Sequence, residues 1–274
     1  MRTECDSGDH RPRKRFGQHF LHDRTTIEAI IATIAARPDD HLVEIGPGEG
    51  VLTRFLIASG ARLDAVELDR DLVKRLSARL GDAPNFALHQ GDALAFDFAQ
   101  LGASDRSLRM VGNLPYNIST PLLVRLLFDY GAVIRDMVFM LQREVVDRLA
   151  AMPRDRDYGR LSVMAQALCT VEPQFIVPPD AFRPPPKVMS AVVRLTPRET
   201  PFPSALRIRL EDLVKTAFAQ RRKTLRHTLG KAVEAEILAE CGIGLQQRAE
   251  EIPVATYVRL AELITRTASG MESH

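Results

Sequence analysis

Residues 42–50 read LVEIGPGEG, a short apolar run that leads directly into a turn with three glycines. The run has the length of a buried strand, and residues 51–58 after it have a helix-like pattern. Glycine has no Cβ, so the backbone of such a turn can approach a ligand closely. Because ligands of open parallel sheets bind beyond the carboxyl ends of the strands, this segment predicts a strand, a ligand-binding turn and a helix.

Segments with strand and helix patterns alternate on both sides of this turn. Strand-like runs occupy residues 63–68, 85–89, 108–111 and 133–141, and helix-like segments occupy residues 27–36, 71–80, 120–128 and 144–151. Thr25 and Glu28 have the spacing of a capping box, and Thr120 precedes a proline in the manner of an N-cap. The alternation predicts an α/β fold with a mostly parallel sheet and helices on both faces.

The pattern changes after residue 171. Two strand-like runs, residues 174–177 and 188–195, are separated by prolines, and a proline-containing linker follows at residues 197–203. From residue 204 onward the pattern is helical only. We therefore predict two domains, an α/β domain over residues 1–199 and a smaller all-helical domain over residues 200–274.

The composition is that of an ordinary globular protein. Of the 274 residues, 45% are hydrophobic and 26% are charged, so disorder of the whole chain is excluded. The 37 basic and 35 acidic residues nearly balance, so the net charge of +2 indicates no class of partner. The three cysteines form no CxxC pair, which argues against a disulfide framework and a metal site. We expect a cytoplasmic protein without a membrane segment, because neither a secretory h-region nor an apolar run of about 18 residues is present.

The glycine turn, with Gly46, Gly48 and Gly50, and two acidic residues further along the chain together form a candidate nucleoside-binding site. Glu67 stands about twenty residues beyond the turn, at the end of the next strand, where a carboxylate can accept both ribose hydroxyls. Asp92, after the third strand, can accept from an adenine amino group or simply cap a turn. NAD and S-adenosylmethionine both fit such a site, but the early third glycine (GxGxG, not GxGxxG) leans away from a dinucleotide.

The tetrapeptide NLPY, residues 113–116, follows the fourth strand and is predicted to lie beside the same crevice. The exocyclic amine of adenine is a poor nucleophile because its lone pair is delocalised into the ring. The Asn113 side-chain oxygen and the Leu114 carbonyl can accept both of its N–H bonds and so localise that lone pair. Pro115 restricts Leu114 to an extended conformation, and Tyr116 can stack on the base. No strong general base is needed, because the methylated nitrogen loses its proton readily; the alternative is a strand-ending turn with a packed tyrosine.

Six motifs in this order resemble those of the small-subunit ribosomal RNA adenine N6,N6-dimethyltransferases, the KsgA-type enzymes. They read KRFGQHFL (14–21), VEIGPG (43–48), VELD (66–69), GNLPYNIST (112–120), FRPPPKVMS (182–190) and QRRKTLR (220–226). Each motif is modestly specific alone, and the set in family order is highly specific. The resemblance implies a Rossmann-like, S-adenosylmethionine-dependent methyltransferase domain followed by the helical domain.

The resemblance also implies the reaction and the residues that carry it. S-adenosylmethionine is the methyl donor, and two adjacent adenosines near the 3′ end of 16S-type small-subunit ribosomal RNA are dimethylated during small-subunit biogenesis. By motif position, the catalytic residues are Asn113, Leu114, Pro115 and Tyr116, and the cofactor contacts are His19, Leu21, Gly46, Glu67, Asp92 and Asn113. Phe182 is implied to face the target base opposite Tyr116.

His19 departs from the family pattern, in which asparagine is usual at this position. Both side chains donate a hydrogen bond, but histidine also ionises near neutral pH. We therefore hypothesise that cofactor affinity is mildly pH-dependent between about pH 5.5 and 7.5. The alternative is a loop histidine without a role.

Two basic clusters are candidates for RNA contacts. One lies within residues 11–15, and the other comprises Arg221, Arg222, Lys223 and Arg226. A solvated charged face is the ordinary explanation of such a cluster, but neither contains an acidic residue and the implied partner, small-subunit ribosomal RNA or a 30S subunit precursor, is a polyanion. We predict that the second cluster binds RNA, in an enzyme that is a monomer because nothing in the sequence requires a partner chain.

Three other functions remain as alternatives. The first is a large-subunit RNA adenine methyltransferase of the erythromycin-resistance type. The second is a ribosome-assembly factor that binds RNA without methylating it. The third is a dinucleotide oxidoreductase, which has no use for the NLPY tetrapeptide.

Overall fold

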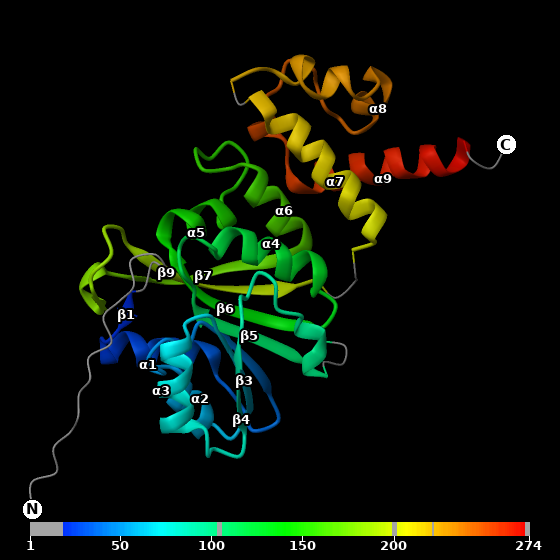
Figure 1. The fold of residues 1–274 in the computed structure, drawn as a ribbon. Helices are drawn as coiled ribbons and strands as arrows, with labels where there is room; N and C mark the ends of the chain where they lie inside the picture. The colour runs from blue at the N-terminus through cyan, green and yellow to red at the C-terminus, as the bar shows by residue number, and fades with distance from the viewer. Residues whose placement is uncertain (1–18, 103–105, 199–201, 221, 272–274) are drawn as a thin grey trace, which may run out of the picture.

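The computed structural model describes residues 19–102, 106–198, 202–220 and 222–271. Within them, a seven-stranded sheet in the order β4-β3-β2-β5-β6-β9-β7 forms the centre of the larger part of the molecule (Figure 1). Its strands are β2 (His41–Ile45), β3 (Arg62–Glu67), β4 (Phe86–Gln90), β5 (Leu108–Asn113), β6 (Ile134–Gln142), β7 (Cys169–Val177) and β9 (Ser190–Pro197).

The first five strands of that order are parallel, and the last two pairings, β6 with β9 and β9 with β7, are antiparallel. From β2 the chain first moves outward to β3 and β4 and then returns to the other side of β2 with β5. The strand order therefore reverses between β2 and β5. In open α/β sheets the ligand crevice forms at this switch point, beyond the carboxyl ends of the strands.

Helices cover both faces of the sheet, as predicted. The helices of this part are α1 (Arg24–Ile34), α2 (Thr53–Ala58), α3 (Arg70–Leu80), α4 (Ser119–Asp129), α5 (Arg143–Ala150) and α6 (Arg160–Leu168). One apolar cluster joins α1 and α2 to Leu42, Leu63 and Val111 of the sheet. A second cluster joins α4, α5 and α6 to residues of the opposite face, including Val43 and Met110. Successive residues alternate between the two cores because side chains of a strand point to opposite faces.

Two predicted helix starts are wrong in detail. Helix α1 begins earlier, with Asp23 as its N-cap, because the Asp23 carboxylate accepts the Thr26 backbone N–H at 2.7 Å. Glu28 instead accepts from the Arg24 side chain, so the expected capping box with Thr25 is not formed. Helix α4 begins at Ser119 after Ile118, which places Thr120 inside the helix and not at its N-cap.

Helix α6 and most of β7 were not predicted from the sequence. Pro173 interrupts the pattern of β7, and the register with β9 shifts between Pro173 and Phe175. An edge strand tolerates this, because one side of it needs no ladder hydrogen bonds. The nine-residue strand therefore begins at Cys169, ahead of the run expected at residues 174–177.

The C-terminal part contains α7 (Ser204–Ala217), α8 (Ala235–Glu240) and α9 (Val254–Met271), joined by short 3-10 turns. These helices lie at one end of the molecule, above the sheet in Figure 1. Their apolar core includes Tyr158 and Val163 from the α6 region. The Tyr158 hydroxyl donates to the Ile252 carbonyl at 2.8 Å, so α6 belongs to this core as well as to that of the sheet. None of the described helices is both long and apolar enough to cross a bilayer.

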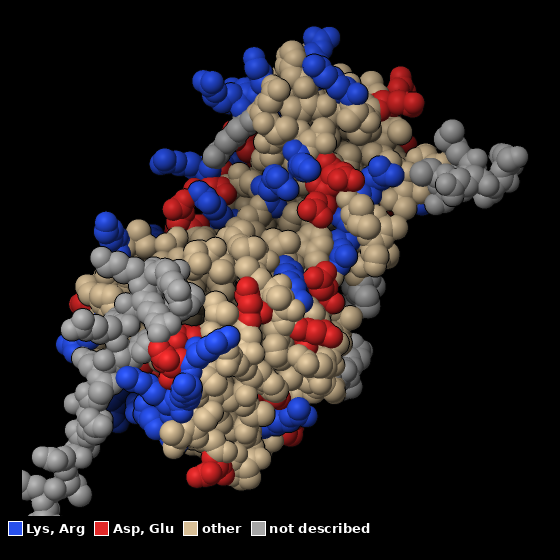
Figure 2. Space-filling view, viewed as in Figure 1, with Lys and Arg blue, Asp and Glu red and all other residues tan. Residues whose placement is uncertain are grey.

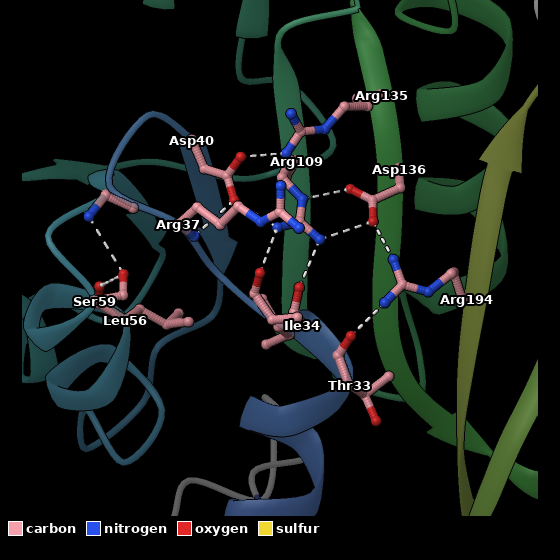
Figure 3. A network of polar contacts seen from close by, with 12 residues as sticks. Thr33, Ile34, Arg37, Asp40, Leu56, Ser59, Arg109, Arg135, Asp136 and Arg194 are labelled. Atoms are coloured by element: carbon pink, nitrogen blue, oxygen red, sulfur yellow. Dashed lines mark hydrogen bonds and ion pairs between the residues drawn. The ribbon is translucent and has the colours of Figure 1, made fainter.

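A buried network of charges ties the amino ends of the central strands together (Figure 3). The Arg109 guanidinium on β5 donates to Asp40 at 2.6 Å and to Asp136 of β6 at 2.8 Å. It also donates to the Ile34 carbonyl at the end of α1. Arg135 and Arg194 pair with the same two carboxylates. The glycine turn follows the carboxyl end of β2, so this network lies at the opposite end of the strands. It anchors α1 against them.

Candidate active site

A cavity of about 310 Å³ opens at the carboxyl ends of β2, β3 and β5. It lies at the switch point of the sheet, where the topology places a ligand crevice. Its walls contain all of the catalytic and cofactor residues that the motifs implied: His19, Leu21, Gly46, Glu67, Asp92, Asn113, Leu114, Pro115 and Tyr116. Residues nearly 100 positions apart in the sequence thus meet in one cavity.

The glycine turn forms one wall through its backbone. Gly46, Gly48 and Gly50 have φ values of +66°, +60° and +77°, a region that favours glycine. A Cβ on Gly48 would lie 3.4 Å from the ring of Phe20 and would crowd that ring. The Gly48 N–H donates to the Glu67 carboxylate at 3.1 Å, which couples this turn to the end of β3.

Glu67 is held in place from two sides. Its Oε2 accepts from the Gly48 N–H and its Oε1 accepts from the Asp69 N–H at 2.9 Å. Burial raises the pKa of its carboxyl group, although these two backbone hydrogen bonds oppose that shift. Each carboxylate oxygen has two acceptor sites, so Glu67 keeps capacity for hydroxyl donors in the cavity.

Glu44 also lines the cavity, and the sequence reasoning assigned it no role. The Thr53 hydroxyl donates to its Oε2 at 2.7 Å. Burial raises the pKa of the Glu44 carboxyl group to about 7. The signal that points to this residue is an acidic side chain inside the apolar strand directly before the glycine turn.

Asp92 caps a turn and also lines the cavity. Its Oδ1 accepts the Leu94 N–H at 2.9 Å, which caps the turn after β4. The residue nevertheless lies on the cavity wall.

Asn113 ends β5, and a residue near the N-terminus orients its side chain. Its Nδ2 donates to the His19 carbonyl at 3.1 Å. With the donor nitrogen engaged there, the side-chain oxygen is the end that remains for an N–H donor in the cavity. Leu114 is buried in the core and its N–H donates to the Met140 carbonyl at 3.1 Å. Its position is therefore set by the sheet.

Tyr116 is fixed by its hydroxyl group and covered by a histidine ring. The hydroxyl hydrogen-bonds Ser190 Oγ at 2.7 Å, and Ser190 is fully buried at the start of β9. Burial raises the pKa of the Tyr116 phenol, so the ring is uncharged at neutral pH. The imidazole of His19 is stacked on it at a centroid distance of 5.7 Å. Sequence reasoning did not foresee the Ser190 bond or this ring pair.

The structure does not bring Phe182 to the target-base position. Its side chain is 2% exposed and packs in the core with Leu21 and Ile27. The cause is the short antiparallel pair of β1 (Phe20–Leu21) and β8 (Phe182–Arg183), which sets Phe182 opposite Leu21 and turns it inward. Phe182 is not among the described residues that line the cavity, so the implication that it faces the base is corrected to a packing role.

The described part of the second basic cluster is exposed. Arg222, Lys223 and Arg226 all lie on the surface, in turns that Leu225 anchors in the helical core. Figure 2 shows several Lys and Arg side chains on the end of the molecule formed by the C-terminal helices. Arg221, the first basic cluster and the start of the KRFGQHFL motif lie outside the described residues. Among those that are described, no group of three or more His, Cys, Asp or Glu side chains is arranged to hold a metal ion.

The fold and the cavity define a class of protein. A doubly wound sheet with a glycine turn, an acidic residue at the next strand end and an amide at the switch point characterise Rossmann-like methyltransferases. The structure is similar to that of a dimethyladenosine transferase from Plasmodium falciparum, with a TM-score of 0.76 and 24% identity over 91% of this chain and 98% of that chain. It is also similar to the 23S rRNA methyltransferase ErmE, with a TM-score of 0.69 and 29% identity over 89% and 98% of the two chains.

The sequence comparisons identify the family within that class. The model of the ribosomal RNA adenine dimethylase family matches residues 9–266. A ribosomal RNA small subunit methyltransferase A from Pseudomonas savastanoi is 55% identical over 93% of this chain and 96% of its own, and one from Pseudomonas aeruginosa is 54% identical over 92% and 94%. The chain belongs to the ribosomal RNA adenine dimethylase family. It is an S-adenosylmethionine-dependent adenine methyltransferase that acts on ribosomal RNA.

Proposed function

We propose that this enzyme dimethylates the N6 amines of two adjacent adenosines near the 3′ end of 16S-type small-subunit ribosomal RNA, as part of small-subunit biogenesis. The observation that carries the proposal is the Asn113 amide, whose nitrogen is engaged by the His19 carbonyl beside the cavity. An amide held this way presents an oxygen to the amine that is to be methylated. Relatives named for the small subunit are 53–55% identical, compared with 29% for the 23S enzyme, which favours small-subunit RNA as the substrate.

The cavity residues fit S-adenosylmethionine, which would supply the methyl group. Glu67 is a buried, anchored carboxylate that can accept both ribose hydroxyls. Asp92 can accept from the adenine amino group of the cofactor. Gly46 keeps the turn free of a side chain, and Leu21 adds an apolar wall.

The reaction needs positioning more than acid–base catalysis. Asn113 Oδ1 and the Leu114 carbonyl accept the two N–H bonds of the target amine, which localises its lone pair and aims it into the cavity. Tyr116 supports the base by stacking. The methylated nitrogen then loses its proton to water. Rate enhancement comes from orientation and from preorganised acceptors in a partly dry site.

We propose that residues 1–199 carry out catalysis and residues 200–274 help hold RNA. The exposed cations Arg222, Lys223 and Arg226, together with Arg221, are the proposed phosphate contacts. Such contacts position a nucleic acid without reading its sequence. The enzyme is proposed to act as a cytoplasmic monomer on a 30S subunit precursor.

The test uses labelled S-adenosylmethionine and small ribosomal subunits that lack adenine dimethylation. The proposal predicts four methyl groups per subunit, mapped to two neighbouring adenosines, and a loss of transfer in Asn113→Ala. Transfer to large-subunit RNA would support the resistance-type enzyme. Tight binding of small subunits without transfer would support an assembly factor.

A further inference from the structure

The ring of Tyr116, on which the target base would stack, already carries another ring. The His19 imidazole lies over it with centroids 5.7 Å apart and planes inclined by 29°, a normal attractive aromatic pair. A base between two rings needs roughly 7 Å, because each stacked contact takes about 3.5 Å. An adenine therefore cannot enter between His19 and Tyr116 while the two rings remain in this position.

His19 is held over Tyr116 by contacts on both sides. Its Nδ1 donates to the Pro184 carbonyl at 2.7 Å, and its own carbonyl accepts the Asn113 amide at 3.1 Å. The next residue, Phe20, pairs with Arg183 in the β1–β8 ladder. The backbone of His19 is thus anchored, whereas its ring is held by one hydrogen bond and one ring contact.

His19, Asn113 and Tyr116 all line the same cavity. The His19 carbonyl accepts the Asn113 amide and the His19 imidazole stacks on Tyr116, so this ring fills cavity space beside Tyr116. A base that presents its amine to Asn113 and stacks on Tyr116 needs this same space.

We propose that the His19 imidazole is a placeholder for the target adenine, stacked on Tyr116 in the RNA-free enzyme and displaced when the flipped base enters. This inference rests on the proposed function of the site. Rotation of the side chain breaks the Pro184 bond and the ring contact but leaves the bond between the His19 carbonyl and Asn113 in place. Base entry is then an exchange of one stacked ring for another, so bases that stack poorly or do not bind Asn113 fail to displace His19. His19 is a positioning residue for the reaction and not a catalytic one.

The test measures stacking directly, without methyl transfer. An RNA hairpin from the 3′ end of small-subunit RNA carries 2-aminopurine at the target adenosine, and quenching of its fluorescence reports insertion against Tyr116. Removal of the imidazole in His19→Ala frees the ring, so half-maximal quenching should occur at an RNA concentration about three- to tenfold lower. Tyr116→Ala should abolish the quenching, which verifies the probe.

His22→Ala is the matched control, since His22 is an exposed histidine on the same segment. It should bind and quench as the wild type does. His19→Phe keeps a ring without the Pro184 hydrogen bond and should fall between wild type and His19→Ala.

Two results would overturn the placeholder. Weaker quenching in His19→Ala would mean that His19 clamps the base. An unchanged RNA titration, with or without a change in cofactor affinity, would mean that the base does not displace the His19 ring. With methyl transfer to small subunits that lack adenine dimethylation as the second readout, KM for RNA should fall in His19→Ala. A wild type that quenches but does not methylate small subunits would refute the proposed function while leaving the placeholder standing.

Discussion

Glu44 illustrates how burial of a single side chain sets a pH response. Its carboxyl group is fully buried, with one hydrogen bond from Thr53, so the neutral form is favoured and the pKa rises from 4.5 to about 7. Because Glu44 binds its proton more tightly in the folded enzyme than in the unfolded chain, protonation stabilises the fold. This stabilisation is complete below pH 4.5 and is lost as the pH rises toward 7.

We expect Glu44→Gln to remove this pH dependence. The free energy of unfolding of the wild type should fall between pH 4.5 and 7 relative to the variant, by up to about 3 kcal/mol. Urea unfolding of the cofactor-free protein at pH 5 and pH 8 measures the difference. Glu172→Gln, an exposed glutamate on β7, is the control and should show no such change. A constant difference between Glu44→Gln and wild type at both pH values would contradict the assignment.

Gly112 sets how closely β5 approaches the end of β2, just before the glycine turn. It has φ +157°, and a Cβ there would lie 2.5 Å from the Ile45 carbonyl oxygen, well inside van der Waals contact. The next residue is Asn113, so any shift of β5 moves the side-chain amide that is proposed to bind the target amine.

Gly112→Ala should therefore destabilise the fold by about 2–3 kcal/mol and reduce methyl transfer further than the loss of stability explains. Thermal unfolding and methyl counting under conditions where the variant is folded measure the two effects. Gly159→Ala, with nothing within 4 Å of the added Cβ, should change stability by less than about 0.5 kcal/mol. Equal effects of the two substitutions would argue against the close approach as the cause.

The elements of the sheet depend on the buried charge network at their amino ends. Arg109 is 6% exposed and bridges Asp40 and Asp136. Hydrogen bonds from Arg135, the Arg37 backbone N–H and Arg109 outweigh the effect of burial and hold the pKa of Asp40 below its ordinary value. Arg135 and Arg194 keep partial pairing of these carboxylates if Arg109 is removed. Three arginines and two aspartates thus join α1, β5, β6 and β9.

Replacement of Arg109 by methionine should cost about 3–5 kcal/mol, because it leaves buried carboxylates without their main partner. Cofactor binding to the folded fraction should persist, since the network lies at the far edge of the sheet. Arg62→Met removes an exposed arginine from a pair with Asp64 and should cost at most about 1 kcal/mol. Urea midpoints of the two variants measure the contrast, and similar midpoints would show that the network contributes little.

At the scale of the whole molecule, arginines fix the chain where the α/β part leads into the C-terminal part. Arg198 donates to the carbonyls of Gln166 and Ala167 at the end of α6, and Arg106 donates to the carbonyls of Pro197 and Arg198. The apolar core shared by α6 and the C-terminal helices joins the two parts and orients the proposed RNA-holding part relative to the cavity.

Triple replacement of Arg222, Lys223 and Arg226 by alanine should weaken RNA binding and flatten its salt dependence. If each cation meets a phosphate, the slope of log affinity against log salt should fall by about 2–3. Cofactor affinity should stay the same. The matched control replaces three exposed cations of the catalytic part, Arg37, Arg54 and Lys74, and an equal loss of slope there would contradict a specific RNA-holding surface.

The alternation of strands and helices, the glycine turn and the NLPY tetrapeptide can all be identified from the amino-acid sequence alone. Each of these depends on neighbours in the chain: apolar periodicity, the need for glycine at positive φ, and the restriction that proline places on the residue before it. The parallel sheet of β2 to β6 and the gathering of the motif residues in one cavity followed from that pattern, because strand ends of one sheet lie at one edge.

Contacts between residues distant in the chain depend on the tertiary fold and have no local signature in the sequence. Phe182 and Tyr116 are both aromatic residues within two positions of a proline, yet the β1–β8 pair buries the first and the bond to Ser190 holds the second at the cavity. Neither the His19–Tyr116 ring pair nor the Arg109 network has a local sequence signal, because their partners lie tens of residues apart. Local patterns specify the elements, but the packing of those elements selects which side chains face the site.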